Sequence, residues 1–195
     1  MAIVINGSGT VTGLAVGGLP DGTVDAGTLA TNSVDSAELV DGSIDTAHIG
    51  TDQITSAILP AGSVLQVLST TQGAYATSTS STYVDTGISQ TITPSSTSSK
   101  IFVLISACIG NANSAKNNNV RIMRDSTELV SFSRVMFNGA GHSSAQQIFT
   151  YLDSPSTTSA VSYKLQMMTD SGTLRLNDSS GDSSTSVITL MEIAG

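Results

Sequence analysis

Aliphatic residues recur at every fifth position through the N-terminal part of the chain, and this spacing constrains the fold more than any other feature. The residues that share it are Val24, Leu29, Val34, Leu39, Ile44, Ile49 and Ile54. A spacing of five matches neither the period of a helix nor that of a strand. It also differs from the coiled-coil heptad and from the glycine triplet of collagen. Repeats of this kind form thin, quasi-linear elements whose units bury their apolar residues against neighbouring units or neighbouring chains.

The same segment also repeats in tens, with an aspartate at a constant place. Asp25, Asp35 and Asp45 each follow the β-branched member of a pair of apolar residues. Aspartate ahead of small residues is a good helix N-cap, and Glu38 stands three residues after Asp35, as in a capping box. We therefore expect each unit to hold a short extended piece, an Asp-capped turn of helix and a return to the axis.

Two arrangements fit this repeat. In the first, several copies of the chain pack the aliphatic residues around a common axis and form a shaft. In the second, a single chain coils as a β-helix, because small residues such as Gly22, Gly27 and Ala37 resemble the pattern of pentapeptide-repeat proteins. The run is short for a self-standing solenoid, which favours the multi-chain shaft.

Charge is scarce and unevenly distributed. Charged residues make up 11% of the chain, and the net charge is −8. Residues 1–61 hold seven acidic residues and no Lys or Arg, whereas residues 62–195 hold eight acidic and seven basic residues. An acidic N-terminal part without a basic patch argues against nucleic acid or an anionic membrane surface as a partner.

The single cysteine and the N-terminal residues narrow the class of protein further. Cys108 is the single cysteine, which excludes an internal disulfide framework. It lies in the apolar run 101–109, where a buried small hydrophobe is favoured over a nucleophile. No signal peptide and no stretch of membrane-spanning length is apparent, so we expect synthesis in a cytoplasm.

Three parts are expected along the chain. Residues 1–20 form a small separate unit in which residues 3–5 make a strand and residues 11–14 pair back on it. So few apolar residues cannot fold alone, so we expect a partner or sister chains to order them. Residues 21–61 form the repeat shaft, and residues 62–195 form the globular domain.

Residues 62–195 predict about nine short strands separated by turns. The expected strands cover residues 64–68, 83–88 with 90–92, 101–109, 120–124, 128–135, 147–152, 161–167, 174–176 and 187–193. Their alternation indicates a β-sandwich of the jelly-roll kind without a sizeable helix. We expect 101–109 to be a central strand and the last strand to lie inside a sheet.

Few residues suggest catalysis or metal binding. His142 is the histidine available to the β domain, and its surroundings do not form a nucleophile elbow. His48 occupies a polar slot of the repeat, where a solvated side chain is favoured over an ion site on the axis. Capping explains the shaft aspartates better than a cation site does, since their spacing differs from a calcium loop. We expect no enzyme activity, no cofactor and no metal; an axial ion is the open alternative.

Loops on the rigid β scaffold are the best candidates for ligand contact. Three of them, near residues 111–119, 138–144 and 177–184, are rich in amides that can read hydroxyl groups. The candidate ligand residues are Asn111, Asn113, Lys116, Asn117, Asn118, Asn138, His142, Asn177 and Asp178. Ordinary polar hairpin loops are the alternative, and the absence of Trp weakens a carbohydrate-stacking argument.

The order of these parts resembles the fibre proteins of tailed bacteriophages. Residues 42–49, Gly-Ser-Ile-Asp-Thr-Ala-His-Ile, look like the repeats of phage tail-fibre shafts. Residues 63–67, 92–101 and 188–193 look like terminal domains of small fibres in phages of aquatic bacteria, and residues 4–10 look like the start of such proteins. These segments are spread over most of the chain.

The resemblance implies a mainly β homotrimer with a thin trimeric repeat shaft followed by a C-terminal jelly-roll-like β-sandwich. The N-terminal segment would attach to another virion protein through Ile3, Val4, Ile5, Val11 and Leu14. The C-terminal knob would bind the host surface, where a glycan is the expected ligand. The alternative is a head fibre or capsid decoration protein without a specific ligand. The repeat independently predicts a multi-chain fibre, but it does not give the number three.

Overall fold

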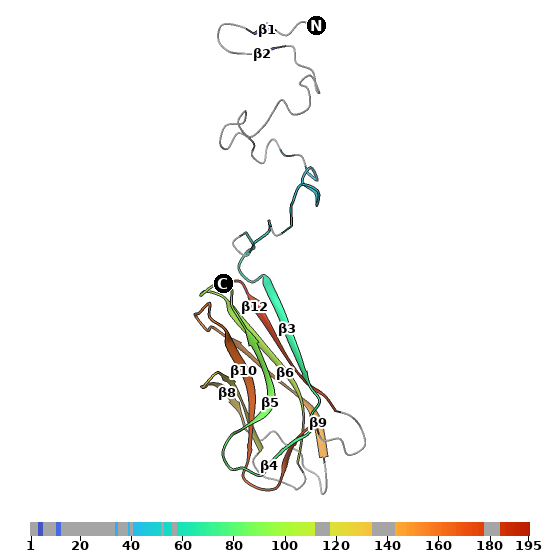
Figure 1. Cartoon of the computed structure of the whole chain (residues 1–195), viewed down its shortest axis with the longest axis vertical. Helices are drawn as coiled ribbons and strands as arrows, with labels where there is room; N and C mark the ends of the chain where they lie inside the picture. The colour runs from blue at the N-terminus through green and yellow to red at the C-terminus, as the bar shows by residue number, and fades with distance from the viewer. Residues whose placement is uncertain are drawn as a thin grey trace. The chain divides into compact units, whose positions relative to one another are not determined.

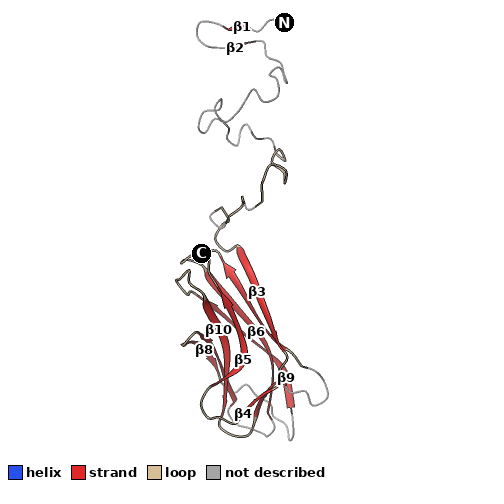
Figure 2. Ribbon diagram, viewed as in Figure 1, coloured by secondary structure: helices blue, strands red, loops and turns tan. Residues whose placement is uncertain are grey.

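The structure, a computed structural model, describes residues 4–5, 11–12, 34, 39, 41–51, 53–55, 58–111, 118–133, 143–177 and 184–195. The chain divides into two compact units, Met1–Gln53 and Ile54–Gly195. Strands are the only regular secondary structure in the described ranges, which confirms the mainly β class (Figures 1 and 2).

The first unit contains a short antiparallel strand pair. Strand β1 (Val4–Ile5) pairs with β2 (Val11–Thr12), with Val4 opposite Thr12 and Ile5 opposite Val11. The prediction that the chain pairs back on itself here is confirmed. A pair of two-residue strands is not stable alone in water, so this element depends on further contacts.

Hydrogen-bonded turns recur every five residues where the repeat is described. The turns begin at Asp45, Gly50, Thr55 and Pro60. In each turn, the backbone amide three residues later donates a hydrogen bond to the carbonyl of the first residue, at 3.0 to 3.2 Å. Each turn starts directly after an aliphatic residue, which is Ile44, Ile49, Ile54 or Leu59. The backbone therefore has the same period as the side chains.

Asp45 shows how one of these turns is closed. Its carboxylate accepts a hydrogen bond from the amide of Ala47 at 2.8 Å, which is the predicted capping contact. The predicted turn of helix is corrected here, because the segment is a β-turn and no helix occurs in the described part of the repeat. A five-residue period leaves too few residues for a helical nucleus before the next unit begins.

Two antiparallel sheets form the second unit. The four-stranded sheet has the order β5 (Val84–Ile92), β10 (Val161–Thr169), β7 (Asn118–Arg124) and β8 (Thr127–Phe132). The six-stranded sheet has the order β3 (Val64–Gln72), β12 (Ser186–Ile193), β6 (Lys100–Asn111), β11 (Leu174–Leu176) and β4 (Ala76–Ser78). Its remaining strand, β9 (Ser143–Asp153), pairs with the other edge of β6.

The chain alternates between the two sheets. It passes from β3 to β5, back to β6 and across to β7, and after the β7–β8 hairpin it returns through β9, β10 and β12. This connectivity is the one expected of a jelly-roll sandwich. Strand β6 is central and β12 lies between β3 and β6, as the sequence predicts.

Two details differ from the predicted strands. Residues 84–92 form one strand, whose register shifts opposite residues 164–166 of β10. Gly87 lies in this irregularity with φ of 88°, a conformation that favours glycine, so the chain passes through it without ending the strand. Strand β4 was not predicted, because Ala-Thr-Ser carries no apolar run.

Alternating side chains from both sheets fill the space between them. Ile101, Val103 and Ile105 of β6 and Tyr163 and Leu165 of β10 are fully buried. Burying a large apolar side chain of this kind contributes about 1.5–3 kcal/mol. The single cysteine is buried too, as expected of a small hydrophobe.

A buried ionic cluster ties β9 to the four-stranded sheet. Asp153 accepts hydrogen bonds from Arg124 of β7 and from the phenol of Tyr163 on β10, each at 2.7 Å. Burial raises the pKa of Tyr163 and the Asp153 carboxylate raises it further, so the phenol stays protonated and keeps donating. Removing one partner would leave a buried charge unmatched, so the cluster specifies how these strands meet.

A second buried carboxylate holds the β5–β6 connection against the sheet. Glu192 of β12 is fully buried and accepts hydrogen bonds from Nε2 of Gln66 at 2.6 Å and from the amide and hydroxyl of Ser95, both at 2.7 Å. Burial alone would raise the pKa of Glu192, but these hydrogen bonds hold it below its ordinary value of 4.5. The carboxylate is therefore ionised at neutral pH.

We expect Glu192→Gln to lower the free energy of unfolding at neutral pH by about 1–3 kcal/mol, because a charged acceptor of three hydrogen bonds is lost. The native pKa lies below the unfolded one, so the wild-type advantage is present above pH 4.5 and declines as the pH falls through the native pKa. Urea unfolding at a series of pH values measures the difference.

The matched control is Glu128→Gln, whose carboxylate pairs with Arg121 at the surface at 2.7 Å. This change should cost no more than about 1 kcal/mol. Equal losses in the two variants, or a loss at Glu192 that does not vary with pH, would contradict the assignment.

Candidate assembly and ligand-binding surfaces

The described aliphatic residues of the repeat are exposed in the single chain. Val34, Leu39, Ile44, Ile49 and Ile54 are between 39% and 52% exposed. Val24 and Leu29 lie outside the described residues. A single-chain solenoid would enclose such side chains, and the choice between it and the multi-chain shaft stays a prediction. An aliphatic row left in water is the surface that sister chains are predicted to cover.

The five-residue register continues into the sandwich. Leu59 stands five residues after Ile54, and Val64, the first residue of β3, stands five residues after Leu59. Val64 is 51% exposed. The repeat register therefore extends beyond the seven residues recognised in the sequence and ends on a strand of the six-stranded sheet.

His48 and Asp45 form a local pair within one turn. Nδ1 of His48 lies 2.8 Å from Oδ1 of Asp45, and both side chains are exposed. The amide of Ala47 and then His48 lower the pKa of Asp45. In the part of the chain that the structure describes, no three His, Cys, Asp or Glu side chains group closely enough to hold a metal ion. Capping accounts for the described contacts of Asp45, and an axial ion stays a prediction.

The predicted attachment residues are described only through their backbone. Val4 and Ile5 lie in β1 and Val11 lies in β2. Ile3 and Leu14 fall outside the described residues. The structure thus places three of the five predicted residues on one paired element.

The ends of the strands that carry the predicted ligand loops meet at one end of the sandwich. Asn111, at the end of β6, pairs with Ser143 at the start of β9 and with Leu174 of β11. At the opposite end, Lys100 of β6 pairs with Ile193, which is itself opposite Val64. The strand ends that carry the predicted ligand loops therefore lie at the end of the sandwich opposite the point where the chain enters β3.

Two of the candidate ligand residues pair with each other below the first loop. Nδ2 of Asn111 donates to Oδ1 of Asn118 at 2.9 Å, and both residues are buried. The bond joins the end of β6 to the start of β7. These two amides therefore position the ends of the loop, while Asn113, Lys116 and Asn117 lie outside the described residues.

The side chain of Asn177 likewise forms its hydrogen bonds within the protein. Its Nδ2 donates to the carbonyls of Gln72 at 2.7 Å and Ala74 at 3.0 Å, and its Oδ1 accepts from the hydroxyl of Ser186 at 2.7 Å. The residue is buried and has a left-handed φ of 53°. It holds the β3–β4 connection against β12. The other candidates, Asn138, His142 and Asp178, fall outside the described residues.

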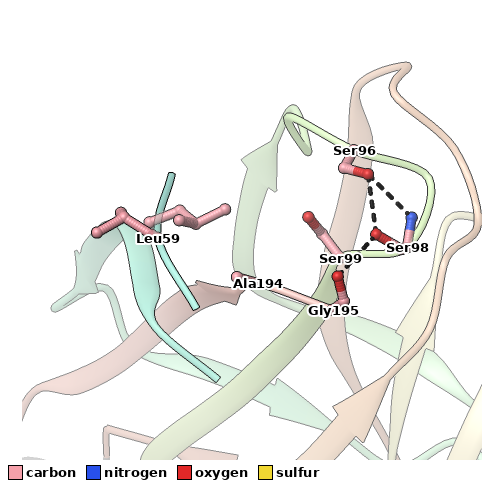
Figure 3. A pocket seen from close by; sticks show the side chains of 7 residues that line it. Leu59, Ser96, Ser98, Ser99, Ala194 and Gly195 are labelled. Carbon is pink, nitrogen blue, oxygen red and sulfur yellow. Dashed lines mark hydrogen bonds between the residues drawn. The ribbon is translucent and has the colours of Figure 1, made fainter. Parts of the chain in front are cut away.

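A surface pocket lies at the end where the chain enters β3 (Figure 3). Its volume is about 330 Å³, and its lining consists of Leu59, Leu65, Ser96, Ser98, Ser99, Ala194 and Gly195. The hydroxyl of Ser98 donates to the carbonyl of Gly195 at 3.1 Å, and its amide donates to the hydroxyl of Ser96 at 3.2 Å. The lining offers apolar contact and hydroxyl groups.

The outer face of the six-stranded sheet is an apolar surface that was not predicted from the sequence. The sequence of β6 indicates this surface, because large apolar residues occupy both odd and even positions of the strand. Ile101, Val103 and Ile105 face the core, whereas Phe102 and Leu104 face outward. A strand that is apolar on both faces usually has both faces covered.

The chain matches no protein-family model and no curated protein sequence. Among the residues that the structure describes, no helix is long and apolar enough to cross a membrane.

We expect Asn177→Ala to lower the free energy of unfolding by about 2 kcal/mol, because three side-chain hydrogen bonds are lost and the carbonyls of Gln72 and Ala74 and the buried hydroxyl of Ser186 lose their partner. Asn177→Gly loses the same bonds but tolerates the left-handed φ, so it should cost about 1 kcal/mol less. Urea unfolding of both variants checks the order. Unchanged stability in Asn177→Ala would contradict the positioning role.

Proposed function

We propose that the chain is a structural fibre of a bacteriophage virion. Three copies assemble around the repeat, the N-terminal segment anchors the fibre to another virion protein, and the knob formed by residues 62–195 binds a host surface glycan through its distal loops. The resemblance of the repeat and of the terminal segments to phage fibres motivates this assignment. No enzyme activity is part of it.

The observation that carries the proposal is the shared five-residue period of side chains and turns. Aliphatic residues from Val34 to Ile54 are exposed in one chain, and the turns beginning at Asp45, Gly50 and Thr55 present them at constant intervals. Exposed apolar area gains about 25 cal/mol for every Å² removed from water, so copies of the chain that meet along this row stabilise one another. Closed rotational symmetry gives every copy the same contacts, and the family resemblance implies a threefold axis.

The position of the predicted ligand loops supports a host-binding knob. Their anchoring strand ends meet at the end of the sandwich opposite Lys100, Ile193 and Val64. The buried Asn111–Asn118 bond holds the base of one loop. A rigid base lowers the entropic cost of ordering a loop on a ligand, which favours recognition there.

One observation favours the alternative of a head fibre or decoration protein. The described amides among the candidate ligand residues, those of Asn111, Asn118 and Asn177, bond within the protein. Amide side chains that hydrogen-bond within the protein are also compatible with a purely structural role for the knob. Binding measurements therefore have to separate the two functions.

We expect light scattering coupled to size exclusion to give the full chain a mass near three times 19.8 kDa. Ile44→Asp should shift this mass toward a single chain, because an unpaired carboxylate among packed apolar residues costs several kcal/mol. The matched control is Ile58→Asp, since Ile58 is also exposed in this region but lies off the five-residue register. A monomeric wild type, or equal effects of the two variants, would overturn the shaft.

We expect the full chain to bind at least one member of a panel of bacterial surface polysaccharides. Replacing Asn113, Lys116 and Asn117 together by alanine should weaken this binding by about tenfold or more, since each lost polar contact is worth about 1 kcal/mol. Light scattering on the same variant controls for assembly. Binding to no polysaccharide, with antibody label on the capsid of the virion, would favour the decoration protein instead.

A further inference from the structure

The outer faces of the two sheets differ in charge. On the four-stranded sheet, Lys164 pairs with Asp85 at 3.0 Å and Arg121 pairs with Glu128 at 2.7 Å. Gln166 joins the two pairs, because its Nε2 donates to Asp85 and its Oε1 accepts from Arg121. A connected row of charged groups of this kind is suited to water.

The outer face of the six-stranded sheet is apolar instead. One row crosses four adjacent strands, with Leu152 of β9 opposite Phe102 of β6, Phe102 opposite Met191 of β12, and Met191 opposite Val67 of β3. Leu152 and Val67 are 50% and 54% exposed. The inward side chains of the same strands already fill the core, so these residues have no place inside the sandwich.

The rows on either side continue the apolar surface. Ile148 and Val187 flank Ser106 in one row, and Ile193 lies beside Val64 in another. Leu104 lies between them, with threonines on both sides. Across β9, β6, β12 and β3, the described residues of this face include one charged side chain, Lys100, and no carboxylate.

We propose that this outer face of β9, β6, β12 and β3 is the surface through which the knobs of sister chains pack against one another. The occupant is a second copy of this chain. The inference rests on the proposed fibre and names the knob contact that the repeat alone does not define.

Continuity with the repeat register is the first argument for this occupant. Val64 stands in the five-residue series that runs through Ile54 and Leu59, and it also belongs to the apolar sheet face. Val64 is thus a member of both sets: the repeat residues predicted to contact sister chains and the outward residues of the sheet. A sister chain that covers Val64 therefore contacts the apolar sheet face as well.

Charge is the second argument. The knob holds eight acidic and seven basic residues, so the placement of its charged side chains, not its net charge, distinguishes its two outer faces. A contact through the four-stranded sheet would have to remove the Lys164–Asp85 and Arg121–Glu128 ion pairs from water, which costs free energy. The outer face of β9, β6, β12 and β3 has Lys100 as its one charged side chain among the described residues, so copies can meet there without removing an ion pair from water.

The size of the face fits an interface that closes together with the shaft. Four strands about 4.8 Å apart and about seven residues of β3 give a plane of roughly 400 Å². A standard interface buries about 800 Å² on each partner. The face therefore supplies a substantial share of the contact area but depends on the shaft for the rest.

Cysteine accessibility in the assembled full chain tests the proposal. Val67→Cys places a thiol on the face, and Tyr75→Cys is the matched control, because Tyr75 is 51% exposed but lies outside these four strands. We expect native alkylation of Val67→Cys to be about tenfold slower or more, since reaction of a thiol requires its exposure. The unmodified chain measures the contribution of buried Cys108.

The mass of each variant separates this inference from the proposed function. A multimer with a protected Val67→Cys supports both. A multimer in which Val67→Cys reacts as fast as Tyr75→Cys overturns the sheet contact and leaves the shaft in place. A monomer, whatever the reactivity of its thiols, overturns the sheet contact and the proposed fibre together.

Discussion

The need to bury aliphatic side chains in a chain with few charges governs this structure at every level. Inside the sandwich, Ile105, Tyr163, Leu165 and their neighbours meet across the two sheets and are fully buried. In the repeat, residues such as Ile44 have the same chemistry and are exposed in the single chain. The sandwich therefore completes its core within one chain, whereas the described aliphatic residues of the repeat are not covered by their own chain.

The few buried polar groups position strands and loops. Asp153, Glu192 and Asn177 each accept or donate several hydrogen bonds between segments that are distant in sequence. Because an unpaired buried polar group is costly, these contacts specify one arrangement of the strands. Asp153 and Glu192 lie opposite Ile101, near the end of the sandwich where the chain enters β3, whereas Asn177 lies at the end where the predicted ligand loops begin.

Much of the fold was predictable because its signals are local. The central strand β6 and the enclosed strand β12 were both predicted from long apolar runs. Strand β4 was missed because Ala-Thr-Ser resembles a loop, and its pairing with β11 depends on residues almost a hundred positions away. The side chain at Asp45 caps its turn as predicted, but the turn is not helical, since the next unit begins too soon.

The sequence by itself determined the five-residue period, the strand-rich C-terminal domain and the separation of acidic repeat from nearly neutral knob, because these properties depend on near neighbours along the chain. Only the tertiary structure decided which side chains are buried or form hydrogen bonds within the protein. Asn111 and Asn177 look like surface loop amides in the sequence, yet strand pairing places both in buried hydrogen bonds. Phe102 and Ile101 are adjacent apolar residues, and only the packing of the second sheet decides that Ile101 is enclosed while Phe102 faces outward. A two-residue period sends neighbours to opposite faces, but which face becomes the core depends on contacts distant in sequence.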